Sequence, residues 1–291
     1  MLALPQGANV PSNEVPEVHV PDDAEDMAAL LDALYNPRSM LLKRLDPDTP
    51  LKIKGLLHLA TKYDMTSIRS MLIQQLESDW PLNLEDWRKM YDQQQDFLRR
   101  KATTFDSHNL DLNFPEAASA FRMAVDYDIP SIIPAIVYTL ITIPLTHNWD
   151  DERTFPHGKL YGDIAKGKIR TAKWEMLTVK EILQIARAKE VFCTRSAKLP
   201  ISRVAQGFCH DSSIPCQCIL EKIFVTRREL SPSVFSTQSP DPLKSLREMF
   251  LSQDMEFLCN GCRQANQELI RAKEQEHWNA LIALPICKSR P

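Results

Sequence analysis

Residues 55–80 read GLLHLATKYDMTSIRSMLIQQLESDW, a run in which apolar side chains recur with helical spacing. The spacing i, i+3, i+4 and i+7 marks one face of an α-helix, and it occurs on both sides of the Tyr63–Asp64 pair. These faces consist of Ile53, Leu56, Leu57 and Ala60 before the pair, and of Ile68, Met71, Leu72 and Leu76 after it. The pattern predicts two amphipathic helices joined by a tight turn, with Asp64 and Thr66 capping the second helix.

The same pattern returns at residues 124–140, which read AVDYDIPSIIPAIVYTL and match ATKYDMTSIRSMLIQQL at residues 60–76. The residues that are identical in the two copies form the pairs Ala60/Ala124, Tyr63/Tyr127, Asp64/Asp128, Ser67/Ser131, Ile68/Ile132 and Leu76/Leu140. Such a repeat indicates one helix–turn–helix unit used twice, with each copy burying its apolar face against its neighbours. Because two copies are too few for a solenoid, we expect a helical scaffold that contains two equivalent hairpins.

The composition argues against several kinds of partner. The chain of 291 residues carries 35 lysines and arginines against 38 aspartates and glutamates, a net charge of −3. This balance predicts neither a nucleic acid nor an anionic membrane as a partner. The 7 glycines are few and the 20 prolines many for this length, which argues against glycine-rich phosphate loops and favours helices separated by prolines.

Two apolar stretches bear on the cellular compartment. Residues 1–6 lack the basic start of a secretory signal, and Pro5 ends their apolar run. The most apolar segment, residues 132–145, is interrupted by Pro134 and Pro144 and is too short to span a bilayer. We therefore expect an intracellular protein, in the cytoplasm or the nucleus, with no membrane partner and with reduced thiols rather than disulfides.

Changes in pattern divide the chain into successive regions. We expect a disordered tail at residues 1–16, a first structured region at residues 17–80, a helical region at residues 81–192 that includes the second hairpin at residues 115–145, and a cysteine-containing helical region at residues 193–291. In the first region, Val18 and Val20 alternate with polar residues and predict a short strand. The length is enough for one long or two ordinary domains.

A helix is expected to follow this strand. Asp22 and Glu25 have the spacing of a capping box at its start, and Asn36–Pro37 marks its end. Its apolar face consists of Met27, Leu30, Leu31 and Leu34.

These residues also carry a resemblance to a known family. The segment EVHVPDDAEDMAALLDALY (17–35), then a loop, then LLHLATKYDMTSIRSMLIQQL (56–76), resembles the second half of a BTB (POZ) domain. The turn ATKYD at residues 60–64 looks like the "ADKYD" turn of that family, and the closest resemblance is to fungal BTB-domain-containing proteins. It implies a partial BTB-like region at residues 17–80 and a protein that binds other proteins, by self-association or by docking to a cullin-type scaffold.

The chain also departs from that family. A complete BTB domain begins with two further strands and two helices, which carry most of its dimer interface, whereas only a short polar tail precedes the strand expected here. We therefore expect a truncated form. The expected fold class is mainly α: helical hairpins and a BTB-like remnant of one short strand plus helices, followed by an irregular all-helical region.

The cysteines supply the candidate site. All 7 lie after residue 192, and Cys259-Asn-Gly-Cys262 has the spacing and turn residues of a zinc knuckle. Structural zinc takes four ligands, so Cys216 and Cys218 are the candidates for the second pair, with Cys209 or His210 as substitutes.

Two other interpretations of these cysteines stay open. In a helical intracellular protein, cysteines are commonly small buried hydrophobes, and this is the interpretation we favour from sequence, with no cofactor required. A redox-active Cys259–Cys262 pair is the other, although no thioredoxin-like strand and helix precede it.

Catalytic motifs do not occur in the sequence. It contains no Gly-x-Ser-x-Gly, no His-Glu-x-x-His and no dinucleotide-binding fingerprint. The segment 162–169 approaches a phosphate-binding loop, but Ile169 occupies the position where the hydroxyl residue that holds magnesium is needed. We therefore predict no enzyme but a non-catalytic protein–protein interaction protein, a scaffold or adaptor. The alternative is a helical module that binds structural zinc through its C-terminal cysteines.

Overall fold

The computed structural model describes residues 19–36, 42–101, 109–150, 170–196, 216, 219 and 241–287. The predicted mainly α fold is confirmed, because the only β pairing among these residues is a single bridge between Asn148 and Ala172. Its elements are α1 (Ala24–Tyr35), α2 (Thr49–Lys62), α3 (Thr66–Ser78), α4 (Leu84–Lys101), η2 (Leu110–Leu112), α5 (Ala117–Asp126), α6 (Ile133–Thr142), η3 (Trp174–Met176), α9 (Val179–Ser196), α11 (Pro242–Phe250), η5 (Gln253–Phe257), α12 (Asn260–Ile282) and η6 (Pro285–Cys287).

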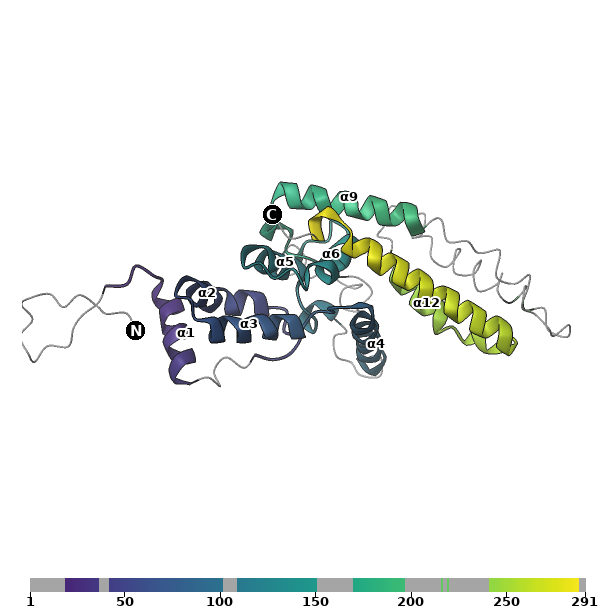
Figure 1. The fold of residues 1–291 in the computed structure, drawn as a ribbon, viewed down its shortest axis with the longest axis horizontal. Helices are drawn as coiled ribbons and strands as arrows, with labels where there is room; N and C mark the ends of the chain where they lie inside the picture. Colours follow the sequence, from purple (N-terminus) through teal and green to yellow (C-terminus); the bar gives the residue numbers. More distant parts are fainter. Residues whose placement is uncertain are drawn as a thin grey trace, which may run out of the picture.

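The helices are arranged as an elongated row (Figure 1). Helices α1, α2 and α3 gather at one end, α5 and α6 lie in the middle, and α9 and α12 extend from the middle towards the other end. Helix α2 packs against α3, α5 against α6, and α2 also against α5, so the two hairpins are in contact. The expected tail at residues 1–16 lies outside the described residues.

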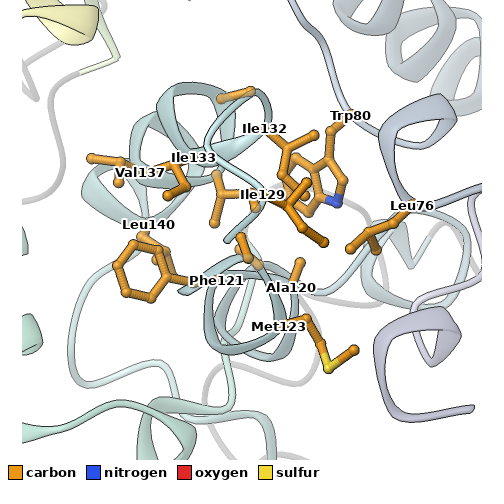
Figure 2. Close-up of a cluster of buried hydrophobic side chains, with 14 of the residues drawn as sticks. Leu76, Trp80, Ala120, Phe121, Met123, Ile129, Ile132, Ile133, Val137 and Leu140 are labelled. Atoms are coloured by element: carbon orange, nitrogen blue, oxygen red, sulfur yellow. The ribbon is translucent and has the colours of Figure 1, made fainter. Parts of the chain in front are cut away.

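The two hairpins supply much of the main apolar cluster, which also includes residues of α1, α4, α9, α11 and α12 and is shown in part in Figure 2. The face predicted for the helix before the first turn is buried throughout. In the helix after the turn, Ile68, Leu72 and Leu76 are buried, but Met71 is 38 % exposed. In the second hairpin Phe121, Ile132 and Leu140 are almost completely buried. Burial of this kind is the main stabilising contribution to such a helical body.

The repeated turn has the same backbone structure in both copies. Asp64 and Asp128 each adopt a left-handed conformation with φ of 53°. The N–H of Met65 donates to the carbonyl of Ala60 at 2.8 Å, and the N–H of Ile129 donates to that of Ala124 at 2.8 Å. This is the six-to-one hydrogen bond of a Schellman motif, which ends a helix with one left-handed residue. The prediction that Asp64 and Thr66 cap the following helix is wrong, because the cap position of α3 is Met65 and no side chain caps it.

A glycine at either left-handed position should raise the free energy of unfolding. Asp64→Gly and Asp128→Gly are each expected to add about 0.5–1 kcal/mol, because glycine adopts a positive φ without a β-carbon clash. Urea unfolding of the two variants measures this. Ser70→Gly, at an exposed position inside α3, is the control and should lose about 0.5–1 kcal/mol. A loss in all three variants would contradict the left-handed turn.

The start of α1 differs from the prediction in detail. Its cap is Asp23, whose carboxylate accepts from the N–H groups of Glu25 at 2.9 Å and Asp26 at 3.2 Å. Asp22 instead accepts hydrogen bonds from Lys62 and Tyr63 at the end of α2, and these bonds lower the pKa of the Asp22 carboxyl. Asp22 therefore ties the approach to α1 to the repeated turn.

The expected short strand at residues 17–20 is not formed at His19 and Val20, which are irregular. Residues 17 and 18 lie outside the described residues. A single short strand needs a neighbouring strand to pair with, and the described residues contain none.

Helix α1 lies close against α2. A β-carbon built on Gly55 of α2 would lie 1.7 Å from Oδ1 of Asp26, so the missing side chain of Gly55 leaves room for the first turn of α1. Leu30 and Ala33 are the buried residues of α1.

The loop before α2 is fixed to the end of α3. Leu45 has a positive φ of 61° and its N–H donates to Oδ1 of Asp79 at 2.8 Å. Asp79 is 1 % exposed, and this burial raises the pKa of its carboxyl. The Leu45 side chain packs with Leu110 and Phe114 in a small separate apolar cluster, which compensates for the unusual backbone conformation of a bulky residue.

Helix α12 spans two apolar clusters. Near its C-terminal end, Trp278 and Leu281 are buried in the main cluster. Near its N-terminal end, Cys262 and Ile270 belong to a second cluster, together with Leu246 of α11. The long final helix predicted from sequence is therefore present, and it ends at Ile282.

Two partly buried polar contacts anchor this C-terminal part to the rest. Arg88 of α4 donates to Oε2 of Glu274 in α12 through Nε at 3.0 Å and Nη2 at 2.5 Å. Tyr138 of α6 donates to the carboxylate of Asp241, which caps α11, and its hydroxyl accepts from the N–H of Leu243 at 3.0 Å. Burial raises the pKa of both Tyr138 and Asp241, so the Tyr138 hydroxyl keeps its proton and remains a donor at neutral pH.

Candidate functional site

The structure brings three of the predicted zinc ligands together. The Sγ atoms of Cys216, Cys259 and Cys262 all lie within 4.8 Å of one another. Cys216 and Cys262 are buried, and Cys259 is partly exposed. None of these cysteines forms a disulfide. The fourth predicted ligand, Cys218, and the substitutes Cys209 and His210 lie outside the described residues.

The start of α12 positions two of these thiols. Cys259 is the cap residue of the helix and Cys262 lies in its first turn, so the x-x spacing places both sulfurs at the same helix end. The preceding turn is held by Arg263, whose Nη2 donates to the carbonyl oxygens of Glu256 at 2.7 Å and Leu258 at 3.3 Å. This contact fixes the chain just before Cys259.

The third thiol comes from a distant part of the sequence. Cys216 has helical backbone conformation, and its sulfur accepts a hydrogen bond from the N–H of Cys259 at 3.5 Å. The sequence spacing of the cysteines did not predict this contact, because it joins two residues that are 43 positions apart and depends on the tertiary structure. This hydrogen bond joins the Cys-x-x-Cys turn to Cys216.

The surroundings of the thiols are apolar. The second apolar cluster includes Met249 of α11, with Met255 and Leu258 just before α12. Burial, followed by the neighbouring thiols of Cys259 and Cys216, raises the pKa of Cys262 to about 12. Without a cation, Cys262 is therefore a neutral thiol at neutral pH and a poor nucleophile.

Helix α1 carries the second candidate site, an exposed apolar face. Leu31, Leu34 and Tyr35 are spaced i, i+3 and i+4, and they are 47 %, 49 % and 88 % exposed. The sequence predicted Leu31 and Leu34 on the buried face together with Leu30. In the structure α1 packs against α2 and buries Leu30 and Ala33, whereas Leu31, Leu34 and Tyr35 stay exposed.

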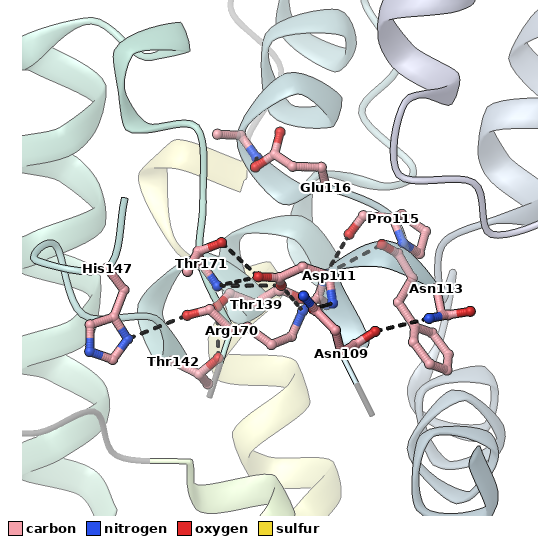
Figure 3. Close-up of polar contacts among 12 residues, drawn as sticks. Asn109, Asp111, Asn113, Pro115, Glu116, Thr139, Thr142, His147, Arg170 and Thr171 are labelled. Carbon is pink, nitrogen blue, oxygen red and sulfur yellow. Dashed lines mark hydrogen bonds and ion pairs between the residues drawn. The ribbon is translucent and has the colours of Figure 1, made fainter. Parts of the chain in front are cut away.

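A buried polar network between residues 109–116 and 170–173 is a structural feature rather than a site (Figure 3). Asp111 accepts from the N–H and hydroxyl of Thr171 at 3.1 and 2.6 Å, and from Nε of Arg170 at 3.2 Å. Glu116 accepts from the N–H groups of Ala118, Ser119 and Lys173 at 2.9, 2.7 and 3.0 Å. Because donors of the chain itself satisfy both carboxylates, the network holds two segments together and offers no open ligand position.

Comparison with known proteins identifies no relative. No protein-family model matches the chain, and no curated protein and no solved structure matches it. In the described part of the chain, no helix combines the length and the apolar character needed to cross a lipid bilayer.

Proposed function

We propose that this chain is a non-catalytic protein-interaction scaffold of the cell interior, in the cytoplasm or the nucleus, and that α1 presents its docking face. The observation that carries the proposal is the exposure of Leu31, Leu34 and Tyr35 on one side of a single helix. Contiguous apolar surface of this kind is typical of protein-binding sites, and tyrosine is enriched among the residues that dominate binding energy. The resemblance of residues 17–80 to part of a BTB domain supports the same kind of function.

The charge of α1 indicates the chemistry of the partner. The helix contains Glu25, Asp26 and Asp32 and no lysine or arginine. Two α1 faces brought together symmetrically would place these carboxylates near each other, which is unfavourable. A complementary partner is an apolar segment flanked by lysine or arginine, which both fills the face and neutralises its rim.

A partner of this kind can come from another protein, such as a cullin-type scaffold, or from a second copy of the chain. Helix α9 exposes Val179 and Leu183 next to Lys180 and Arg187. Its surface therefore has the apolar and basic character that the α1 face requires. Self-association would then be head to tail, α1 of one copy on α9 of the next.

Site-specific cross-linking tests this proposal. With a photo-reactive residue at position 34, we expect a saturable cross-link to a basic apolar segment, either in α9 of a second copy or in another protein. Gln74, exposed on α3, is the matched control position and should give no such product. Leu31→Asp should weaken the interaction by at least about 30-fold, the effect of losing about 2 kcal/mol at a binding hot spot.

Light scattering on the purified chain shows whether the partner is a second copy of the chain or another protein. A mass above that of the monomer, lost in Leu31→Asp, would identify self-association, and a monomer with a cross-linked foreign peptide would identify an adaptor. Equal labelling from positions 34 and 74 would contradict the proposal, because α1 would then bind nothing specifically.

A further inference from the structure

We infer that Cys216, Cys259 and Cys262 bind a zinc ion, which holds the N-terminal end of α12 to the segment that contains Cys216. The inference is independent of the docking face on α1, because it rests on a different part of the chain. The thiols belong to the second apolar cluster, whereas α1 packs on α2 in the main cluster.

The spacing of the sulfur atoms fits a zinc ion. Zinc bound by thiolates at about 2.3 Å in a tetrahedron places its sulfur ligands roughly 3.8 Å apart. The three Sγ atoms already lie within 4.8 Å of one another, so small side-chain rotations bring them to that separation. Three protein sulfurs leave one position of the tetrahedron for a further ligand or a water molecule.

The backbone around the sulfurs also fits bound thiolates. The N–H of Cys259 donates to Sγ of Cys216 at 3.5 Å, and hydrogen bonds of this kind orient and stabilise metal-bound sulfur. No side chain caps α12 at Cys259, and Cys262 lies in the first turn of the helix, so the thiols sit at the helix N-terminus. The positive end of a helix of 23 residues favours the negative charge that three thiolates give to the site.

Convergence of three cysteines is what distinguishes a metal site from packed thiols or a disulfide. A disulfide between Cys259 and Cys262 would use two of the three sulfurs and leave that of Cys216 outside the bond. Packing alone would be served by any small apolar side chain at each position. Among the common divalent metals, zinc is the one that proteins typically bind through cysteine sulfurs alone, in a tetrahedral arrangement.

Zinc binding exchanges the thiol protons for the metal ion. Each thiol releases its proton to the solvent and forms one bond from sulfur to the metal, so three protons leave for one zinc ion. No electron is transferred and no oxidant is required. The product is a cross-link between residue 216 and the start of α12, which is how structural zinc stabilises a small apolar cluster.

Metal analysis of the purified full-length chain tests the inference. We expect about one zinc per chain in the wild type and less than about a tenth of that in Cys262→Ser and Cys259→Ser, since each removes a ligand. Cys287→Ser is the matched control: Cys287 is a buried thiol too, but it lies in the main cluster. This variant should keep its zinc.

Thiol protection separates binding from folding. Added zinc should slow alkylation of Cys216, Cys259 and Cys262 by at least about tenfold in the reduced wild type, and chelation should reverse this. Circular dichroism checks that Cys259→Ser, which alters a partly exposed residue, keeps its helices. Reduced protein that takes up no zinc and shows no protection would overturn the inference. So would equal loss of zinc in Cys287→Ser, or a Cys259–Cys262 disulfide that forms in the presence of zinc and reductant.

Discussion

Replacing Arg88 by alanine is expected to lower the free energy of unfolding by about 3–5 kcal/mol, the range observed when one partner of a buried ion pair is removed. The Glu274 side chain is 1 % exposed, and both of its hydrogen bonds come from Arg88. Its other oxygen, Oε1, has no hydrogen-bond partner among the described residues. Without Arg88, the Glu274 carboxylate loses both of these hydrogen bonds while it stays buried.

Matched variants isolate this effect. Lys89→Ala removes the neighbouring ion pair with Asp86, in which the lysine is 69 % exposed, and should cost no more than about 0.5 kcal/mol. The double variant Arg88→Met with Glu274→Leu should recover most of the loss, because no unpaired charge remains. Urea unfolding gives all three values. A loss below about 1 kcal/mol in Arg88→Ala would show that Glu274 reaches water.

Phe121→Ala is expected to cost about 3–5 kcal/mol, through loss of apolar burial and the cavity that remains. Phe121 is 1 % exposed and lies in α5, beside Leu140 of α6 in the main apolar cluster (Figure 2). Since α5 also contacts α2, the cavity would weaken both hairpins at once. Chemical denaturation is the appropriate measurement.

Met71→Ala is the control for this core substitution. Met71 is 38 % exposed, so its truncation should cost less than about 1 kcal/mol. Similar losses in the two variants would mean that the second hairpin is not the packed centre of the molecule.

Helical periodicity and the internal repeat predicted the two hairpins correctly because both are local patterns. Burial at Leu57 and Leu72 follows from the 3.6-residue period alone. The turn was predicted less well. Asp64 is a favourable cap residue by type, but in the structure it adopts the left-handed conformation that ends α2. A residue-type preference does not distinguish these two uses of aspartate.

The prediction for α1 failed in part for a related reason. An amphipathic pattern shows which residues share a face but not how much of that face has a partner. Leu30 is buried, whereas no element in the described part of the chain covers Leu31 and Leu34 fully, and both stay about half exposed. That difference depends on which elements surround the helix and is invisible in a local window.

The cysteine cluster illustrates the same limit. The spacing of Cys259 and Cys262 predicted that these two would lie together, because residues three apart face the same helix end. Their approach to Cys216 depends on the packing of α11 on α12 and on the second apolar cluster. Sequence could therefore propose Cys216 only as one of several candidates.

Helix α12 is continuous and connects the main apolar cluster mechanically to the second one. At about 1.5 Å per residue, its 23 residues form a rod roughly 35 Å long. The C-terminal end of α12 is buried in the main cluster through its residue Trp278. The N-terminal end carries Cys262, which is buried in the second cluster. An uninterrupted helix resists bending over this length, since the 23 residues contain no proline. A displacement at the cysteine end is therefore transmitted along the rod to the hairpins, and neither cluster can shift far unless the other moves or the helix breaks.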